Sequence, residues 1–261
     1  MSYENQARRV SATVENEVGA EYGDEYLEWK VWKPEEFGQL SKYQEAYFSA
    51  QMKMTKTAFP PQSRVLEIGF GNGSFLAYGA KRQWEMHGTE ANIALVKQAQ
   101  QKGFHAVHTN TLKGFPNGYF DLVLAFDVLE HIPQDRLLAF LRDVQRILRD
   151  KGIFAARFPN GDSPFGRYYQ HGDPTHVTTI GSGKAKYFAG KLDVAIIHLG
   201  AEAEPLWADL THFAHRIFAV PAIRLLNTFL NLIFFPGCPK ALCSLNLILI
   251  FQTEISSPGT K

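Results

Sequence analysis

The sequence predicts an α/β protein built on a doubly wound, mostly parallel sheet of seven strands. Strand-like and helix-like segments alternate between residues 64 and 158, which is typical of strand–helix–strand units around a parallel sheet. Apolar runs of the buried-strand type recur along that stretch. The first of these runs leads into a glycine-rich turn and then a helix, which indicates a nucleotide-type site at the edge of the sheet.

The individual elements follow from local patterns. Apolar runs bounded by turn residues mark the strands, and a period near 3.6 residues marks the helices. No internal repeat interrupts their order. Strands are expected at residues 64–68, 84–89, 105–109, 120–125, 152–158, 192–204 and 245–253, and helices at 73–81, 92–102, 134–149 and 182–191.

The helix at residues 134–149 has the clearest pattern of these elements. Its apolar side chains recur at helical spacing, which predicts one buried face. Lys151 and Gly152 follow it, and we expect this pair to end the helix. The apolar stripe consists of Leu138, Leu141, Val144 and Leu148.

Residues 1–60 form an N-terminal arm, or lid, on the domain at residues 61–261. Residues 1–28 are polar and have no periodicity, so we expect the start of the chain to be loosely ordered. The stretch from Trp29 to Met54 is rich in aromatic side chains and contains one helical face. That face is formed by Tyr43, Tyr47 and Ala50.

Two segments break the regular pattern after residue 158. Residues 159–181 form a loop rich in Gly, Pro, Asp, Tyr and His that is too long for a simple connection, so we expect it to contact the substrate. An apolar helical insertion at residues 207–243 precedes the last strand. Within its helix, residues 216–235, the interruptions share one face and are Arg224, Asn227, Thr228 and Asn231.

Three arrangements of the helix at residues 216–235 are open. A bilayer span needs about 20 mostly apolar residues with few charges, and Arg224 and Pro221 argue against one. A helix that lies in the membrane interface, or that packs on another protein, fits better. A helix that merely covers the edge of the sheet is equally compatible with the pattern.

Composition excludes several classes of function. The 27 Lys and Arg residues balance 26 Asp and Glu residues, so no overall field attracts nucleic acid or an anionic membrane. Cys238 and Cys243 are too few for a disulfide framework, which makes a reducing compartment the default. The first residues lack the pattern of a signal peptide. We therefore expect a cytoplasmic protein, with peripheral membrane contact through residues 216–235 as an option.

The turn after the first strand is the most informative stretch. Glu67 is followed by Gly69, Gly71 and Gly73 at every second position. Glycine lets the backbone take positive φ and approach a ligand closely. The spacing differs from the G-x-G-x-x-G dinucleotide fingerprint, because residue 74 is Ser74. This acid followed by three alternating glycines resembles motif I of the class I S-adenosylmethionine-dependent methyltransferases.

Two further segments support this resemblance. Glu90 stands at the end of the second strand, where an acidic residue binds ribose hydroxyls in similar sheets. The segment from Tyr119 to Pro133 resembles the family's fourth strand and the turn after it. The resemblance implies S-adenosylmethionine as the cofactor and a Rossmann-like methyltransferase fold, whose last strand inserts antiparallel beside the sixth.

By this resemblance, the cofactor-binding residues lie at the ends of the first four strands. Glu67 and the glycine turn should surround the methionine and ribose parts, and Glu90 should accept hydrogen bonds from the ribose hydroxyls. Asn110 stands near the position from which an acid often faces the adenine amine. Phe126 and Asp127 should line the methionine end. The full set is Glu67, Gly69, Phe70, Gly71, Gly73, Glu90, Ala91, Asn110, Thr111, Phe126 and Asp127.

The turn after the fourth strand also bears on the acceptor. Methyltransferases that act on exocyclic amines of bases, or on glutamine amides, typically carry an Asn/Asp-Pro-Pro-aromatic motif there. This chain reads Ala125-Phe-Asp-Val-Leu instead. Together with the balanced charge, this sequence argues against a nucleic-acid acceptor.

Two histidines are candidates for the base that takes a hydroxyl proton as the methyl group arrives. His176 is the stronger, because it lies in the 159–181 loop where a doubly wound sheet places its substrate, and Asp173 could orient it. His131 is the second candidate. For each histidine the alternative is a purely structural role. With His171 the loop offers one carboxylate and two imidazoles, a poor match for magnesium, so we expect no metal.

The segment from Arg157 to His176 resembles more narrowly the type 11 and type 12 methyltransferases associated with bacterial polysaccharide and glycolipid synthesis. It contains an Asp-x-Thr-His element, and Arg167, Tyr168 and Tyr169 supply hydrogen bonds and flat surfaces suited to carbohydrate. The resemblance implies O-methylation of a sugar hydroxyl on a surface glycan or its lipid-linked precursor.

Two alternatives to this function stay open. One is O-methylation of an isoprenoid quinone or another lipophilic phenol, which an aromatic pocket formed by Trp29, Trp32 and Phe165 would favour. The other is a non-catalytic scaffold that binds the cofactor and docks a partner through its apolar helix. The acceptor is in each catalytic case a glycan, a glycolipid or a small molecule.

Overall fold

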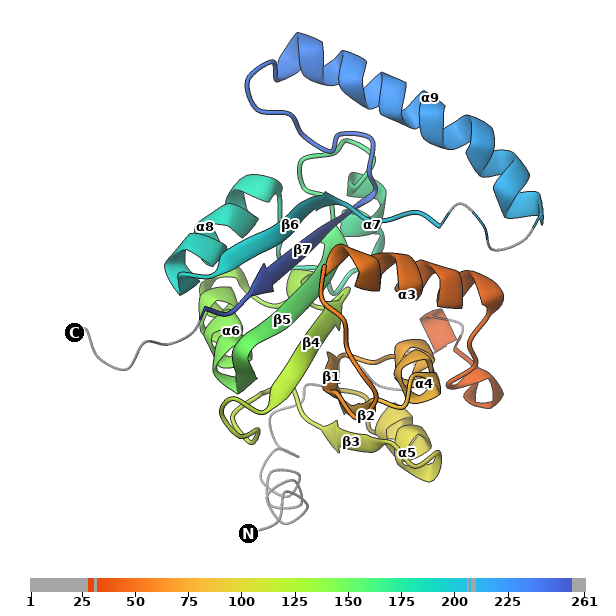
Figure 1. The fold of residues 1–261 in the computed structure, drawn as a ribbon, viewed down its shortest axis with the longest axis vertical. Helices are drawn as coiled ribbons and strands as arrows, with labels where there is room; N and C mark the ends of the chain where they lie inside the picture. Colours follow the sequence, from red (N-terminus) through yellow and green to blue (C-terminus); the bar gives the residue numbers. More distant parts are fainter. Residues whose placement is uncertain (1–27, 31, 206, 208–209, 255–261) are drawn as a thin grey trace.

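A seven-stranded sheet forms the centre of the computed structural model (Figure 1). The structure describes residues 28–30, 32–205, 207 and 210–254, so most of the polar start predicted at residues 1–28 lies outside the described residues. The strands are β1 (Arg64–Ile68), β2 (Glu85–Glu90), β3 (His105–His108), β4 (Phe120–Phe126), β5 (Leu148–Pro159), β6 (Ala195–Ala201) and β7 (Asn246–Gln252).

The strand order is β3-β2-β1-β4-β5-β7-β6, with β1 to β5 parallel and β7 antiparallel to both of its neighbours. This arrangement confirms the predicted fold class, including a last strand that inserts antiparallel beside the sixth. The order reverses between β1 and β4, where Ile68 lies opposite both Thr89 of β2 and Ala125 of β4. Open α/β sheets bind ligands outside the carboxyl ends of the strands at such a reversal.

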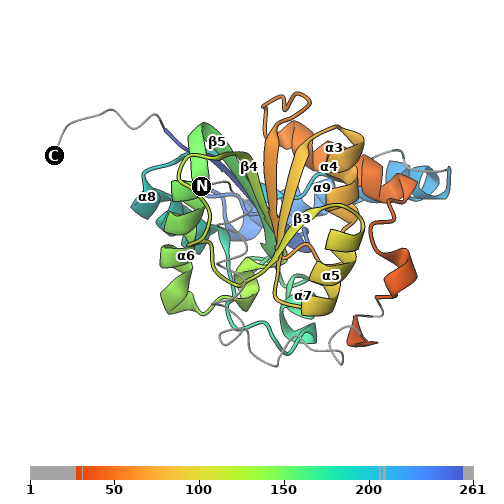
Figure 2. The same ribbon diagram turned by 90° about the horizontal axis from the view of Figure 1, so that it is seen from below.

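Helices cover both faces of the sheet (Figure 2). On one face lie α3 (Lys42–Met54), α4 (Ser74–Lys81) and α5 (Ile93–Gln101), and on the other lie α6 (Gln134–Ile147) and α8 (Ser182–Leu192). Successive strand residues point to opposite faces, so neighbours in β1 divide between two apolar clusters. Val65 belongs to the cluster beneath α3 to α5, and Leu66 belongs to the cluster beneath α6 and α8.

Helix α6 differs from its prediction in its buried face and in its end. It ends at Ile147, and β5 begins with the next residue, Leu148. Leu137 and Ile147 are buried, whereas the predicted Leu138 is only half-buried. The expected helix stop at residues 151–152 is wrong, because that pair lies inside β5, where the pairing with β4 shifts register.

The N-terminal arm contributes helix α3, as its aromatic pattern predicts. A capping box starts the helix: the Gln44 backbone N–H donates to Ser41 Oγ at 3.1 Å, and the Ser41 N–H donates to Gln44 Oε1 at 2.9 Å. Of the predicted face, Tyr47 is buried, whereas Tyr43 and Ala50 are half-buried. The buried face is wider than predicted and consists of Tyr47, Phe48, Gln51 and Met52.

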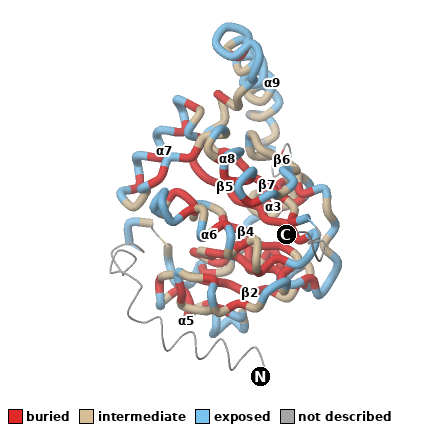
Figure 3. The backbone as a smooth tube through the Cα atoms, turned by 90° about the vertical axis from the view of Figure 1, so that its left-hand side faces the viewer, coloured by how far each residue is buried: buried red, intermediate tan, exposed pale blue. Residues whose placement is uncertain are grey.

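The two segments after residue 158 each contain a helix. The 159–181 loop contains a short helix, α7 (Arg167–Gly172), that its composition did not predict. The predicted helix at residues 216–235 is α9 (Leu210–Phe234), which begins earlier than expected. Figure 3 shows α9 extending beyond the buried core, with most of its backbone coloured as exposed or half-buried.

Candidate functional site

A cavity of about 1380 Å³ lies at the carboxyl ends of the parallel strands. Residues from the ends of β1, β2, β4 and β5 line it together with the N-terminal arm, α3 and the 159–181 loop. Of the predicted cofactor residues, Gly73 alone does not line it. The others all do: Glu67, Gly69, Phe70, Gly71, Glu90, Ala91, Asn110, Thr111, Phe126 and Asp127.

The glycine turn needs glycine for two reasons. Gly69, Gly71 and Gly73 take left-handed φ values of 65°, 52° and 73°, which side chains disfavour. A Cβ at Gly71 would lie 2.8 Å from the Trp32 ring, and a Cβ at Gly73 would lie 2.6 Å from the Phe37 ring. The N-terminal arm therefore packs directly against the turn.

Glu67 and Glu90 bring two carboxyl groups to one end of the cavity. Glu90 accepts hydrogen bonds from the backbone N–H groups of Gly71 at 3.0 Å, Ala91 at 2.7 Å and Asn92 at 3.1 Å, and so holds the glycine turn in place. Burial raises its pKa despite these donors. Burial and the nearby Glu90 raise the pKa of Glu67 well above its usual value. Glu67 Oε2 is buried and has no hydrogen-bond partner among the described residues.

The turn after β3 is fixed by its own hydrogen bonds. Thr109 is buried, and its Oγ1 donates to the carbonyl of Thr111 and accepts from the Thr111 N–H, each at 3.1 Å. Asn110 lies between them, is exposed and lines the cavity. Asn110 thus lies just past β3 at the cavity, and its amide can both donate and accept hydrogen bonds.

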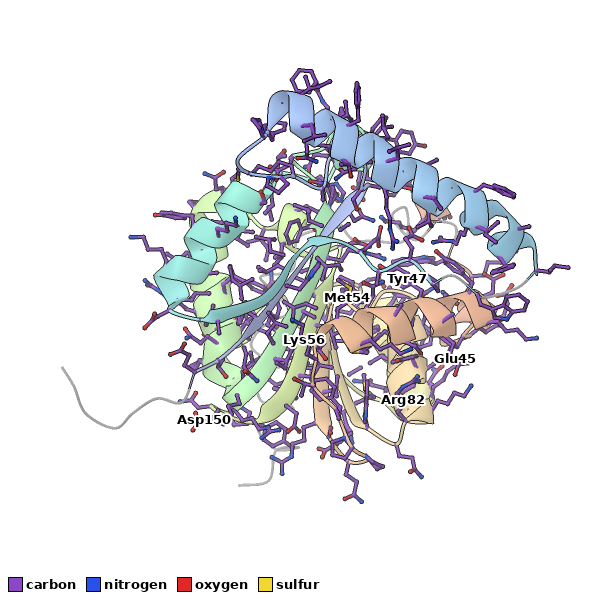
Figure 4. The ribbon with its side chains drawn as sticks, turned by 45° about the horizontal axis from the view of Figure 1, so that its top comes forward. Glu45, Tyr47, Met54, Lys56, Arg82 and Asp150 are labelled. Carbon is purple, nitrogen blue, oxygen red and sulfur yellow. The ribbon has the colours of Figure 1, made fainter. Side chains whose placement is uncertain are left out.

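A polar network that the sequence analysis missed crosses the other end of the cavity. Asp127, which has a φ of 57°, accepts a hydrogen bond from Arg157 Nε at 2.9 Å and forms a second contact with Arg157 Nη2. Arg157 Nη1 donates to the Tyr47 hydroxyl at 2.8 Å, which donates to Glu202 Oε2 at 2.6 Å. Figure 4 labels Tyr47 on α3. An arginine within the apolar run of β5 was the available signal for this network.

His131 lines the cavity at the start of a hydrogen-bonded chain. Its Nδ1 lies 2.9 Å from Thr175 Oγ1, which lies 2.5 Å from Asp173 Oδ1. Asp173 Oδ2 accepts a hydrogen bond from Lys30 Nζ at 3.0 Å. Burial raises the pKa of Asp173, but the hydrogen bonds from Thr175 and the Lys30 ammonium outweigh it and lower the pKa to about 2.

The hydrogen bonds that run from Asp173 through Thr175 to His131 determine the tautomer of the His131 ring. Asp173 is ionised and can only accept, so the single hydroxyl hydrogen of Thr175 points to it. Thr175 Oγ1 then accepts the Nδ1–H of His131, which assigns the imidazole lone pair to Nε2, and the Thr175 backbone also forms a hydrogen bond with the ring. Burial and the neighbouring His176 lower the pKa of His131 to about 4, so the ring is neutral at pH 7. A neutral imidazole can accept a proton, and the lowered pKa makes His131 a weaker base than an ordinary histidine.

His176 lies against His131 but does not line the cavity. The two ring centroids are 4.6 Å apart in an edge-to-face contact. His176 Nε2 lies 3.6 Å from Asp173 Oδ2 and 3.8 Å from Glu130 Oε1. Burial lowers the pKa of His176. The geometry therefore favours His131 over His176 as the group that faces an acceptor, and Asp173 orients His131 through Thr175.

Glu130 adds a buried acid that the sequence analysis overlooked. Neither of its carboxyl oxygens has a hydrogen-bond partner among the described residues, and burial raises its pKa well above the usual value. Ligand atoms of Glu130, His131 and His176 lie within 4.8 Å of one another. The set considered from the sequence does not assemble, because His171 is exposed on α7. The Lys30 ammonium acts on the Glu130 carboxyl and lowers its pKa slightly against the effect of burial.

Comparison with known proteins gives one family match. A family model described as a methyltransferase domain matches residues 22–191. No curated protein matches the chain in a sequence search.

Solved structures share the fold. An S-adenosylmethionine-dependent methyltransferase from Archaeoglobus fulgidus is 22% identical with a TM-score of 0.61, over 88% of this chain and 100% of that chain. The Burkholderia thailandensis 1,6-didemethyltoxoflavin-N1-methyltransferase, solved with bound S-adenosylhomocysteine, is 12% identical with a TM-score of 0.55, over 98% of this chain and 92% of that chain. An S-adenosylmethionine-dependent methyltransferase from Mesorhizobium loti is 14% identical with a TM-score of 0.55, over 79% of this chain and 97% of that chain. At these identities the likeness concerns the fold.

Proposed function

The chain belongs to the methyltransferase-domain family, and on that premise we propose that it transfers a methyl group to a sugar hydroxyl of a surface glycan or its lipid-linked precursor. S-adenosylmethionine is the cofactor, in agreement with the sequence prediction. The acceptor rests on the chemistry of the cavity and on the narrower resemblance of residues 157–176.

The residues at the carboxyl ends of β1 and β2 fit this cofactor. The left-handed glycines allow close approach of the backbone, and Glu90 lines the cavity where it can accept hydrogen bonds from hydroxyl groups. The buried Glu67 Oε2, which has no partner among the described residues, gains one when a cationic ligand binds. When bound, the cofactor supplies a methyl group on a sulfonium, and its displacement leaves a neutral thioether.

The chain's own contribution to the reaction is alignment and proton acceptance. Holding two reactants in line can lower a barrier by ~7–11 kcal/mol. The neutral His131, fixed by Thr175 and Asp173, accepts the proton of the acceptor hydroxyl. Because the proton leaves with the displacement, a neutral alcohol can react without first forming an alkoxide.

The polar lining of the acceptor end is the observation that supports a sugar. Arg157, Glu202 and Asn246 line the cavity together with His131, and each presents donors or acceptors to a polyhydroxylated ligand. Tyr169 lines it as well and offers a flat aromatic surface. The hydroxyl groups of a sugar can use all of these side chains.

The lining does not match the aromatic pocket expected for a lipophilic phenol. Trp29 and Phe165, which such a pocket would need, are about half exposed and do not line the cavity. Trp32 does line it, but its ring packs on Gly71. A phenol would leave the Arg157 and Glu202 side chains without polar partners from the ligand.

The test is a methyl-transfer assay on the full chain with labelled S-adenosylmethionine and three acceptor classes: sugar nucleotides, lipid-linked sugars and a polyprenyl phenol. Label in either sugar class supports the proposal, whereas label in the phenol alone overturns it. A Glu90→Ala variant is the control for cofactor binding. Wild-type protein that binds S-adenosylhomocysteine calorimetrically but labels none of the acceptors would favour the non-catalytic scaffold.

A further inference from the structure

Helix α9 directs large apolar side chains to solvent, whereas Asn227 and Asn231 face the protein, which is the reverse of an ordinary surface helix. Phe218, Leu225, Phe229 and Leu232 recur at the spacing of one helical face and are 79%, 73%, 58% and 70% exposed. Figure 1 shows this helix running outside the body of the molecule. Such an exposed apolar face marks a site of interaction.

The polar side chains of α9 anchor it in this orientation. Asn231 Nδ2 donates to the Lys240 carbonyl at 2.8 Å, and Asn231 Oδ1 accepts from the Lys240 N–H at 2.6 Å. Asn227 Oδ1 accepts from the Cys243 N–H at 3.1 Å. Near the other end, Arg216 pairs with Glu204. Rotating the apolar face inward would break these bonds, so the outward face is fixed by the fold.

We propose that α9 lies in the interface of a lipid bilayer, with its apolar face among the acyl chains. Residues Arg216–Phe234 have a mean hydropathy of 1.7, and 6% of that segment is buried. A helix that lies in the bilayer interface inserts one face about 5–10 Å into the boundary between headgroups and acyl chains. The proposal concerns a surface away from the cavity lining and does not depend on the identity of the methyl acceptor.

The connections of α9 exclude a bilayer span and require an in-plane orientation. The helix is preceded by β6 and followed by β7, which are neighbours in the same sheet. Both of its ends are also tied to the domain. Arg216 Nη2 donates to the Tyr43 hydroxyl of α3 at 3.3 Å, and Asn231 bonds to Lys240, whose ammonium donates to Ser182 of α8 at 2.8 Å. The helix therefore cannot cross a bilayer while the domain stays on one side.

The charge distribution favours anionic lipid as the occupant of this face. From residue 210 to residue 253 the sequence has no Asp or Glu, whereas it has Arg216, Arg224 and Lys240. Arg224 is exposed beside the apolar face, and a long cationic side chain in that position can extend to headgroup phosphates. Basic residues near a membrane surface contribute attraction to anionic lipids.

A second copy of the chain fits this face less well. A two-helix contact buries a narrow seam flanked by charged side chains of both signs. On α9 the exposed apolar side chains extend beyond such a seam, because Ile223, Leu226 and Ile233 are 48%, 45% and 54% exposed. No acidic side chain stands on the helix to pair with the arginines of a partner copy.

The position of α9 links a membrane surface to the predicted substrate loop. Asn160 Nδ2 donates to the Ala241 carbonyl at 2.7 Å, and Ser163 Oγ donates to the Leu242 carbonyl at 2.5 Å. Arg216 pairs with Glu204, which lines the cavity. Docking of α9 would therefore hold the cavity near the bilayer, where a lipid-linked acceptor would be found.

The test is vesicle flotation of the full chain with two lipid compositions, phosphatidylglycerol with phosphatidylcholine and phosphatidylcholine alone. The double variant Leu225→Glu, Phe229→Glu places two charges on the apolar face, and Tyr187→Glu is the matched control. Tyr187 on α8 and Phe229 are both 58% exposed. Near-ultraviolet circular dichroism verifies that each variant keeps the wild-type packing.

We expect wild type and Tyr187→Glu to float with the anionic vesicles, and the double variant to partition at least about tenfold less. Stronger flotation with phosphatidylglycerol than with phosphatidylcholine alone supports the role of the basic residues. Wild-type protein that fails to float with either vesicle overturns the proposal. A wild-type dimer that the double variant dissociates, without flotation, would identify a second copy as the occupant instead.

Discussion

The Lys30 ammonium lies 3.0 Å from Asp173 Oδ2 and joins the N-terminal arm to a loop 143 residues further along the chain. The Asp173 side chain is 5% exposed and that of Lys30 is 28% exposed. Because Asp173 also accepts the Thr175 hydroxyl, and Thr175 contacts His131 Nδ1, the arm contributes to the state of the histidine proposed as the proton acceptor.

Removing this ion pair with Lys30→Met should destabilise the protein by ~1–3 kcal/mol, because Asp173 keeps its charge and loses a buried partner. Urea denaturation measures the change. The pKa of Asp173 should also rise from about 2, which moves acid unfolding to higher pH, because stability present above the ordinary value of 3.8 is then lost sooner as the pH falls.

The control for this variant is Lys33→Met. Lys33 lies 3.9 Å from Glu36, and both side chains are more than half exposed, so the pair should contribute at most ~0.5 kcal/mol. Equal destabilisation by the two substitutions would show that the contact between Lys30 and Asp173 adds nothing specific.

The glycine turn provides a second prediction. Gly71→Ala should weaken S-adenosylhomocysteine binding at least about tenfold, because alanine at a φ of 52° is strained by ~1–2 kcal/mol and its Cβ would also displace Trp32. Isothermal titration calorimetry measures the affinity. Gly103→Ala is the matched control, since Gly103 also has positive φ but a Cβ there meets nothing within 4 Å. Both variants should lose stability, and Gly71→Ala alone should lose affinity.

The fold was predictable because its signals are local. Strands β1 and β4 are mostly apolar runs that end at turns, and the glycine turn after β1 lines the cavity. The end of α6 was not predictable in the same way, because Lys151 and Gly152 resemble a helix stop while tertiary pairing with β4 draws the preceding residues into β5. The pairing of β5 with β4 therefore sets the end of α6 at Ile147, although the local sequence favours a later end.

The placement of Glu67 and Glu90 in one cavity was predictable from the sequence, whereas most of the residues at its other end were not. Glu67 and Glu90 follow strands directly, so their positions in the chain determine their positions in space. Lys30, Glu202 and Thr175 come from three separated segments, and long-range folding brings them to the same cavity. The sequence favoured His176 over His131 as the base because the loop that contains His176 was expected to contact the substrate. That loop does line the cavity, but through Thr175 and Val177 and not through His176.

The two acids at the cofactor end predict a pH-dependent affinity. The raised pKa of Glu67 means that the empty site favours its protonated form, whereas a cationic ligand favours the ionised form. The affinity for S-adenosylmethionine should therefore increase as the pH rises towards that pKa. In the Glu67→Gln variant, the affinity for S-adenosylmethionine measured by calorimetric titration should no longer change as the pH rises towards the Glu67 pKa.

The same substitution should stabilise the cofactor-free protein at neutral pH. A protein with an acid whose folded pKa is raised loses stability as the pH rises above the unfolded value of 4.5, because the carboxyl ionises in the unfolded chain while the folded protein keeps it protonated. Glu85→Gln is the control, because Glu85 is at the amino end of β2 and its pKa is lowered. A pH-dependent affinity that persists in Glu67→Gln would assign the titrating group elsewhere.

Thr175 provides the most direct test of the proton acceptor. Thr175→Val removes the hydroxyl that accepts the Nδ1–H of His131, so the ring can populate the tautomer whose Nε2 is protonated and cannot act as a base. We expect kcat to fall about tenfold or more, within the ~10²–10⁴-fold range of general base catalysis. Affinity for S-adenosylhomocysteine should stay at the wild-type level, and Thr175→Ser should restore kcat because it keeps the hydroxyl.

The pH profile separates this chemical role from a structural one. The pKa of His131 is about 4, so the neutral base is present above that value and wild-type kcat should decrease only as the pH falls through it. In Thr175→Val, Asp173 no longer reaches His131 through the hydroxyl, and the decrease should shift along the pH axis. His131→Asn should remove the titration altogether, because asparagine cannot take the proton. A wild-type profile in both variants would exclude His131 and return His176, which lies 4.6 Å away between ring centroids, as the candidate base.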